Sequence, residues 1–161
     1  MKKLIGIFIF GLGLISCGSD PNTVKQEGSV PAVEETVSNE ISIKATDDMK
    51  FDKTEFTVKA DEEITLNFTN AGVLPIETMG HNVVVLEKNT DVAQFANASA
   101  KAKETDFISE LYLTDIVAHT KLLGPGESET IKFNLKEPGE YTFICTFPGH
   151  WIAMKGTITA I

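Results

Sequence analysis

Three side chains that bind soft metals lie within ten residues near the C-terminal end, in the stretch CTFPGHWIAM. They are the thiol of Cys145, the imidazole of His150 and the thioether of Met154. A second imidazole, His81, stands far upstream in the stretch MGHN. One thiolate, two imidazoles and a weak axial thioether are the donor set of a trigonal copper site used for electron transfer. The sequence therefore predicts one copper ion held by these residues.

Each donor type suits that chemistry. Thiolate sulfur is soft, imidazole serves both copper oxidation states, and a distant thioether favours Cu(I) without imposing a square geometry on Cu(II). Other readings fit less well. A lone cysteine on an alternating strand is usually a small core residue. A catalytic Cys–His pair explains neither Met154 nor His81, and a thioether offers zinc little.

The elements that must position these residues are mostly strands. Apolar and polar residues alternate over 40–46, 55–60, 63–70, 129–135 and 139–147, and residues 155–161 close the chain as a further strand. The run HNVVVLE (81–87) is continuously apolar from Val83 to Leu86, as expected of a strand buried on both faces. Turn signals at 124–127 and 137–140 separate short strands, which predicts an all-β sandwich or barrel.

One stretch departs from this pattern. Residues 90–112 are rich in Ala, Lys and Glu, and Thr90 or Asp91 suits a helix N-cap. We expect one or two short helices there, inserted between strands as a flap over one edge of the sandwich. His119 lies between strand-like and polar residues, and we expect it to be a surface histidine without a metal role.

Three separated stretches resemble one family. LPIETMGHN (74–82), DIVAHTKLLGPGE (115–127) and CTFPGHWIAMKGT (145–157) occur in the order and with the ligand spacing of azurin, a bacterial cupredoxin. The resemblance covers residues 40–161. It implies a Greek-key β-sandwich with a single type 1 copper site. The family's N-terminal disulfide has no counterpart here, and Trp151 and Ile152 stand where azurins have smaller residues.

The resemblance also implies a role for individual residues. His81, Cys145 and His150 correspond to the equatorial ligands and Met154 to the axial thioether. The carbonyl oxygen of Gly80 corresponds to a second, distant axial contact. Asn82 corresponds to a residue that hydrogen-bonds the two ligand loops together.

The two ligand loops also carry apolar residues that are expected to lie at the surface. An apolar rim around His150 on a small domain usually marks a docking site. The alternative for these residues is packing in the core, which we consider mainly for Phe147, next to the metal. The residues expected to form this docking rim are Leu74, Met79, Phe147, Pro148, Trp151 and Ile152.

The N-terminal end predicts export and a lipid anchor. Two lysines, a short apolar run and LISC, with Cys17 last, resemble the signal peptide and lipobox of a bacterial lipoprotein. We expect residues 1–16 to be the signal peptide and residues 17–39 a lipidated Cys17 with a flexible tether. Without Lys2 and Lys3 the chain has 12 lysines against 23 acidic residues, a net charge of −11, which disfavours nucleic acid as a partner.

These observations predict a membrane-tethered one-electron carrier rather than an enzyme. It would lie on the periplasmic side of a bacterial envelope and exchange electrons with redox proteins such as a c-type cytochrome, an oxidase or a reductase. A copper-delivery lipoprotein in the periplasm is the alternative, since it would use the same ligands but release the metal quickly.

Overall fold

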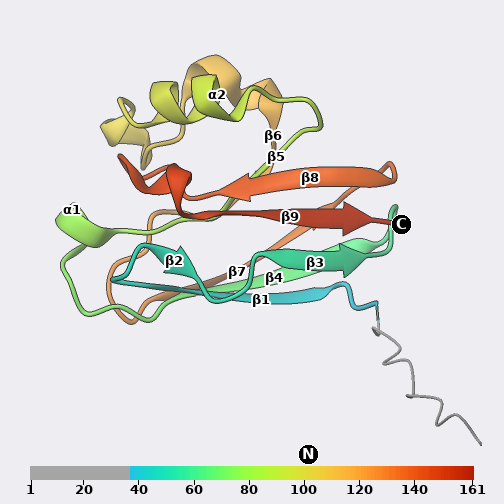
Figure 1. The fold of residues 1–161 in the computed structure, drawn as a ribbon, viewed down its shortest axis with the longest axis horizontal. Coiled ribbons are helices and arrows are strands. Elements are labelled where there is room, and N and C mark those ends of the chain that lie inside the picture. Colours follow the sequence, from blue (N-terminus) through green and yellow to red (C-terminus); the bar gives the residue numbers. More distant parts are fainter. Residues whose placement is uncertain (1–36) are drawn as a thin grey trace, which may run out of the picture. The chain divides into compact units, whose positions relative to one another are not determined.

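The computed structural model describes residues 37–161, which form two β-sheets packed face to face (Figure 1). The predicted signal peptide and most of the predicted tether, including Cys17, lie outside these residues. The first sheet has the order β2-β1-β4-β7 and the second the order β3-β9-β8-β5-β6. The strands of the first sheet are β1 (Glu40–Thr46), β2 (Lys50–Phe51), β4 (Glu63–Asn70) and β7 (Ser128–Asn134). Those of the second are β3 (Glu55–Val58), β5 (Val84–Leu86), β6 (Ile116–His119), β8 (Gly139–Ile144) and β9 (Lys155–Ala160).

Both sheets are mixed. β1 pairs with β4 and β3 pairs with β9 in parallel, while the remaining pairs are antiparallel. The strand order departs from chain order, as the crossing connections of a Greek key require. The predicted all-β sandwich with a short helical insertion is therefore confirmed.

Alternation of side chains produces the core between the sheets. In β4, Ile64, Leu66 and Phe68 are fully buried, while the residues between them are partly exposed. In β8, Tyr141 and Phe143 face the same core, and Cys145 continues their row one residue beyond the strand. Each buried side chain of this size stabilises the fold by about 1.5–3 kcal/mol relative to an exposed one.

The continuously apolar segment is buried on both faces, as the sequence predicts. Val83 and Val85 point into the core between the sheets. Val84 and Leu86 point the other way, into a second apolar cluster. β5 therefore joins two hydrophobic layers through alternate side chains.

The second cluster lies beneath a helical segment between β5 and β6, which we call the flap (residues 91–115; Figure 1). It comprises α2 (Val92–Ser99) and the 3₁₀ turns η1 (Lys103–Thr105) and η2 (Glu110–Asp115). Asp91 caps α2, accepting a hydrogen bond from the Gln94 backbone amide at 3.0 Å. Phe95, Ala96 and Ile108 pack from the flap onto the second sheet.

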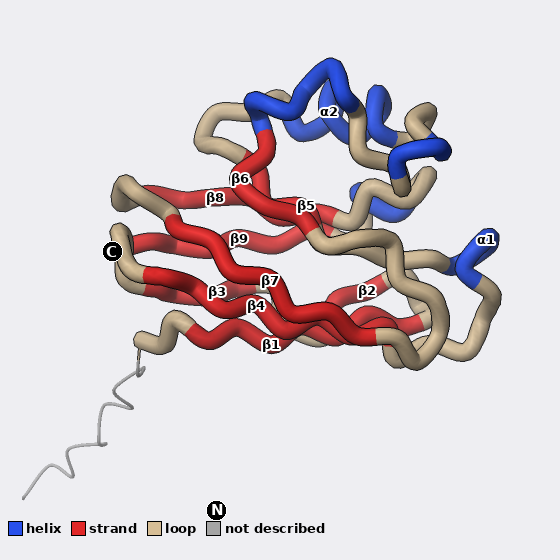
Figure 2. Tube along the Cα trace, turned by 180° about the vertical axis from the view of Figure 1, so that it is seen from behind, coloured by secondary structure: helices blue, strands red, loops and turns tan. Residues whose placement is uncertain are grey.

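Two short helical pieces that the alternation of residues did not predict lie in the ligand loops. They are α1 (Ile76–Met79) and the 3₁₀ turn η3 (His150–Ile152). Figure 2 shows α1 at the end of the sandwich opposite to the chain's C-terminus, and Figure 1 shows the same arrangement from the other side.

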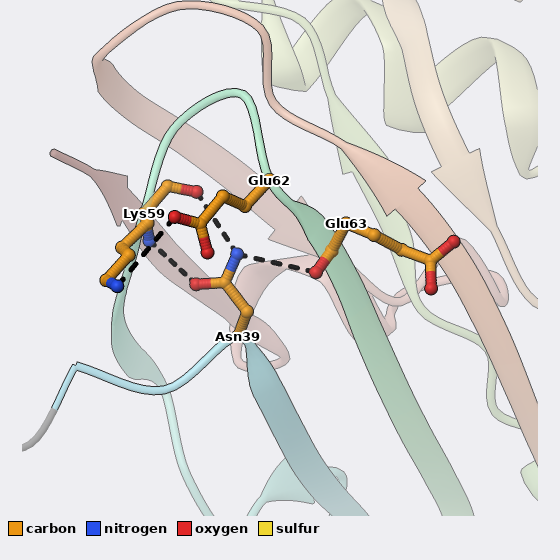
Figure 3. A network of polar contacts seen from close by, with 4 residues as sticks. All are labelled: Asn39, Lys59, Glu62 and Glu63. Carbon is orange, nitrogen blue, oxygen red and sulfur yellow. Dashed lines mark hydrogen bonds and ion pairs between the residues drawn. The ribbon is translucent and has the colours of Figure 1, made fainter.

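Asn39 fastens the start of the folded domain (Figure 3). Its amide nitrogen donates to the carbonyl oxygens of Lys59 and Glu63, and its amide oxygen accepts from the Lys59 backbone amide at 2.8 Å. The side chain thereby joins the entry of β1 to the turn between β3 and β4, one residue before the predicted start of the domain.

None of the helices in residues 37–161 has the length and apolar character needed to span a bilayer.

Candidate metal centre

The structure brings the thiol of Cys145 and the imidazoles of His81 and His150 together in the interior. Their ligand atoms all lie within 4.8 Å of one another, and all three residues are buried. The Sγ atom of Cys145 is 4.0 Å from Nδ1 of His81 and 3.7 Å from Nδ1 of His150. Residues 64 positions apart in the sequence thus share one site.

These separations fit a metal ion between the three atoms. With metal–sulfur and metal–nitrogen bonds of about 2.3 and 2.0 Å, as at zinc sites, a trigonal ion holds sulfur and nitrogen roughly 3.7 Å apart. Both imidazoles turn Nδ1 toward the sulfur, so Nε2 carries the proton when a metal occupies Nδ1. Nε2 of His81 is buried and makes no well-aligned hydrogen bond within the described part of the chain. One thiol and two imidazoles at these separations therefore fit copper.

Local structure positions the three ligands. Cys145 follows β8, and its amide donates to the carbonyl of Met154 at 3.0 Å. Gly149 has a φ of 84°, a left-handed conformation that suits glycine, and it turns the chain into η3 so that His150 returns to the sulfur. His81 is fixed by backbone hydrogen bonds in both directions with Leu123, at 3.2 and 2.8 Å.

Met154 and Gly80 flank the trio along the chain. Met154 is fully buried, and its amide donates to the His150 carbonyl at 2.8 Å. Gly80 is also buried, and a Cβ atom there would lie 2.7 Å from the Ile76 carbonyl oxygen and 3.0 Å from the Leu122 side chain. Glycine is therefore required at position 80 by the close approach of α1 and Leu122.

Burial keeps the three ligands neutral in the absence of metal. It raises the pKa of the Cys145 thiol to about 11, with the backbone near Asn82 and Phe147 acting in the opposite direction. Burial, together with the nearby His81, lowers the pKa of His150 to about 4. Burial also lowers the pKa of His81, partly offset by the Thr46 backbone and the Asp47 carboxylate. Metal binding at neutral pH therefore displaces a proton from the thiol.

Asn82 links the two ligand loops. Its side-chain nitrogen donates to Oγ1 of Thr146 at 2.7 Å, and its oxygen accepts from the Thr146 amide at 2.8 Å. Asn82 and Thr146 follow His81 and Cys145 respectively, and both are buried. The pair therefore fixes the separation of the two loops.

The sequence analysis did not predict two polar residues of the site, Thr146 and Asn70. Thr146 is the partner of Asn82, and its type alone gives no signal of that role. Asn70, at the end of β4, is fully buried and donates to the carbonyl oxygens of Leu123 and Met79 at 3.0 and 3.4 Å. Its signal would have been a polar residue at an inward-facing position of an alternating strand.

The six residues expected to form the docking rim occupy different environments. Ile152 and Leu74 are 68% and 42% exposed, Pro148 is exposed, and Met79 is partly buried. Phe147 is buried, and its ring packs against the His150 ring in a tilted arrangement with centroids 4.7 Å apart. Trp151 is partly buried and packs against the cluster under the flap. Val73, 82% exposed beside Leu74, extends the apolar surface.

His119 lies apart from the trio. It is exposed at the end of β6, and Nδ1 lies 3.1 Å from the Thr120 carbonyl oxygen. This position agrees with the expectation of a surface histidine.

Residues 22–160 match the model of the copper-binding proteins of the plastocyanin/azurin family. The chain is 37% identical over 123 residues to the azurin of Alcaligenes faecalis, covering 74% of this chain and 95% of that protein. It is 36% identical over 123 residues to the azurin of Pseudomonas aeruginosa, covering 74% and 82%.

Solved structures give the same likeness. The reduced auracyanin of Roseiflexus castenholzii superposes with a TM-score of 0.71 at 38% identity, over 78% of this chain and 98% of that one. An azurin of Methylomonas sp. strain J superposes with a TM-score of 0.68 at 30% identity, over 76% and 97%.

Proposed function

The chain belongs to the plastocyanin/azurin family of copper-binding proteins, and from this premise we propose that it is a membrane-tethered carrier of single electrons that cycles between Cu(I) and Cu(II). The observation that carries the proposal is that the thiol of Cys145 and the imidazoles of His81 and His150 lie close together in the protein interior. His81, Cys145 and His150 would hold the copper ion, and the thioether of Met154 and the carbonyl oxygen of Gly80 would be its weaker contacts.

Copper, when bound, supplies the one-electron couple and an intense charge-transfer band with the thiolate. The protein's own contribution is to hold the ligands still and exclude water. The His81–Leu123 and Asn82–Thr146 hydrogen bonds fix the two ligand loops, and all four residues are fully or almost fully buried. A site that cannot rearrange suits both oxidation states and keeps electron transfer fast.

The electron enters and leaves through the edge of His150. His150 as a residue is 3% exposed, and it follows directly on the exposed Pro148–Gly149 turn. Leu74 and Ile152 supply exposed apolar area for docking on the same pair of loops. A small apolar contact favours brief association, which suits a carrier that must release each partner.

The lipid on Cys17 would hold the protein on the periplasmic side of a bacterial membrane. Residues 18–39 would tether the domain there, at high local concentration near membrane-bound oxidases or reductases. A c-type cytochrome is another fitting partner. The lipobox-like LISC sequence supports this part of the proposal.

A visible and EPR spectrum recorded during a redox titration of the copper-loaded protein tests the function. We expect an intense blue band and a type 1 EPR signal that disappear together on one-electron reduction. Tight copper binding without a visible band would overturn the proposal. Treatment of the protein with a copper chelator separates the carrier from a delivery protein, because we expect slow release from a site this enclosed.

A further inference from the structure

Phe107 of the flap contacts Phe147 of the second ligand loop, ahead of His150, and Trp151 on the other side of His150 packs against the cluster beneath the flap. We propose that Phe107 of the flap is a positioning residue for His150, acting through the ring of Phe147. This inference rests on the proposed copper function, in which His150 is a ligand. Phe107 itself is far from the ligand motifs in the sequence, and nothing in its local pattern marks it.

Three rings form a continuous row from the flap to the site. The Phe107 and Phe147 centroids are 5.1 Å apart with an interplanar angle of 67°, an edge-to-face contact. The Phe147 and His150 centroids are 4.7 Å apart with an angle of 40°. Aromatic pairs favour such tilted arrangements over face-to-face stacking. Phe107 and Phe147 are only 8% and 9% exposed, so packing limits the movement of both rings.

The backbone that presents Phe107 is unusual. Asp106 and Phe107 have φ values of 55° and 61°, two consecutive left-handed residues that are not glycine. A bulky residue in this region is an outlier that persists only where the surroundings hold it. The Phe107 amide donates to the Ala102 carbonyl at 2.8 Å, and Thr105 Oγ1 donates to the Ile108 carbonyl at 2.6 Å.

The same turn contacts the ligand loops at a second point. The Asp106 carbonyl oxygen accepts a hydrogen bond from the Asn82 side chain at 3.3 Å. Asn82 is the residue that joins the loops of His81 and Cys145. The turn at Asp106 and Phe107 therefore contacts the Asn82 side chain through the Asp106 carbonyl and the Phe147 ring through Phe107.

Trp151, on the other side of His150, is also packed. It packs against the cluster that contains Ile108, the neighbour of Phe107. The segment from Phe147 to Trp151 is thus packed at both ends, against Phe107 at one end and against the cluster beneath the flap at the other, with His150 between them. Loosening the Phe107 end should let the His150 ring move, which weakens copper retention without removing a ligand.

The experiment compares Phe107→Asn with wild type and with Leu111→Ala, all copper-loaded. Asparagine accepts the left-handed conformation but has no ring, so it removes the edge-to-face contact with Phe147 and relieves the backbone strain. Leu111 lies on the same flap and is 87% exposed, which makes it the matched control. We measure copper release to a chelator, the EPR spectrum and the reduction potential, and we record the His150 ring signals by NMR in the metal-free proteins.

For Phe107→Asn we expect release about tenfold faster, the lower end of the range for outer contacts of metal ligands. We also expect an altered EPR spectrum, a shifted potential and broadened His150 signals. Leu111→Ala should match wild type, and Phe107→Tyr should restore wild-type behaviour. If Phe107→Asn does not fold, Phe107→Leu, which keeps apolar volume, serves in the same comparison.

A blue wild type with a Phe107 variant unchanged in release, EPR and potential would overturn the inference and leave the copper function intact. Equal changes in Leu111→Ala would also overturn it, because the effect would then belong to the flap in general. A wild type without the blue band would instead contradict the copper function itself.

Discussion

Cys145 is the residue on which the chemistry of the site depends most, because it is the only thiol within the folded domain and lies within 4.0 Å of both imidazoles. Its identity as a ligand candidate follows from residue type and spacing to His150 and Met154. The roles of its neighbours depend on three-dimensional contacts. Phe147 is buried against His150, and Trp151 packs against the cluster beneath the flap.

Replacing Cys145 by Ser should abolish the blue band, because the charge transfer requires the thiolate sulfur. Met154→Ala should keep a coloured site with a shifted band and potential, since the three equatorial donors remain. Visible spectroscopy and voltammetry of both loaded variants provide the measurement. A Met154→Ala protein with unchanged spectrum and potential would show that the thioether is not a ligand.

Ile152→Asp should slow electron exchange with a redox partner roughly tenfold, equivalent to about 1.4 kcal/mol. The reason is that a charge on a 68% exposed apolar position disfavours the dry docking contact. Stopped-flow kinetics give the rate, and the visible spectrum should stay as in wild type. Ile161→Asp is the matched control, because Ile161 is 60% exposed at the C-terminus, away from the ligand loops. Equal slowing in both variants would argue against the rim as the dock.

At the scale of elements, alternation predicts β1 and β4 well, because one face of each of these strands is buried. Residues 40–46 and 63–70 are strands over their whole predicted length, as β1 and β4. β2 has only two residues, and α1 and η3 have four and three, too few for any period to appear. The flap was expected over about the right residues, but its contact with Phe147 could not be expected, because that contact joins segments distant in the sequence.

Asn82→Ala should lower the free energy of unfolding by about 2–3 kcal/mol and speed copper release. The substitution leaves the buried amide and hydroxyl of Thr146 without partners and uncouples the ligand loops. Urea unfolding and chelator kinetics measure the two effects. Asn67→Ala, which removes exposed hydrogen bonds to Glu40 and Thr130, is the control and should leave copper release unchanged.

Asn39→Ala should lower the free energy of unfolding by about 1 kcal/mol, because three hydrogen bonds at the start of the domain are lost (Figure 3). Its visible spectrum should not change. Ser38→Ala, whose hydroxyl contacts only the local Glu40 backbone, should be close to neutral. Urea unfolding of the metal-free proteins makes the comparison, and an altered copper spectrum in Asn39→Ala would contradict the separation of the two regions.

For the molecule as a whole, the buried imidazoles make metal-free stability dependent on pH. The pKa of His150 is about 4 in the folded chain against an ordinary value of 6.5. Between these values protons bind the unfolded chain preferentially. The stability that is fully present above pH 6.5 is therefore lost progressively as the pH falls toward 4.

The measurement is urea unfolding of metal-free protein between pH 7 and pH 4, compared with His150→Gln. The variant lacks one titrating ring, so we expect its free energy of unfolding to fall less over this range. Carboxylates titrate alike in both proteins, which isolates the contribution of the ring. Identical slopes would mean that His150 titrates normally in the folded chain.

The two ends of the sandwich have different tasks. The described chain begins at the same end as its C-terminus, while β8 delivers Cys145 at the opposite end, next to α1 (Figures 1 and 2). An anchor attached ahead of Asn39 would therefore pull on the end of the domain that lacks the metal. The end that carries Cys145 would lie away from the point of attachment. It would then be accessible to electron carriers in the surrounding solution as well as to proteins in the same membrane.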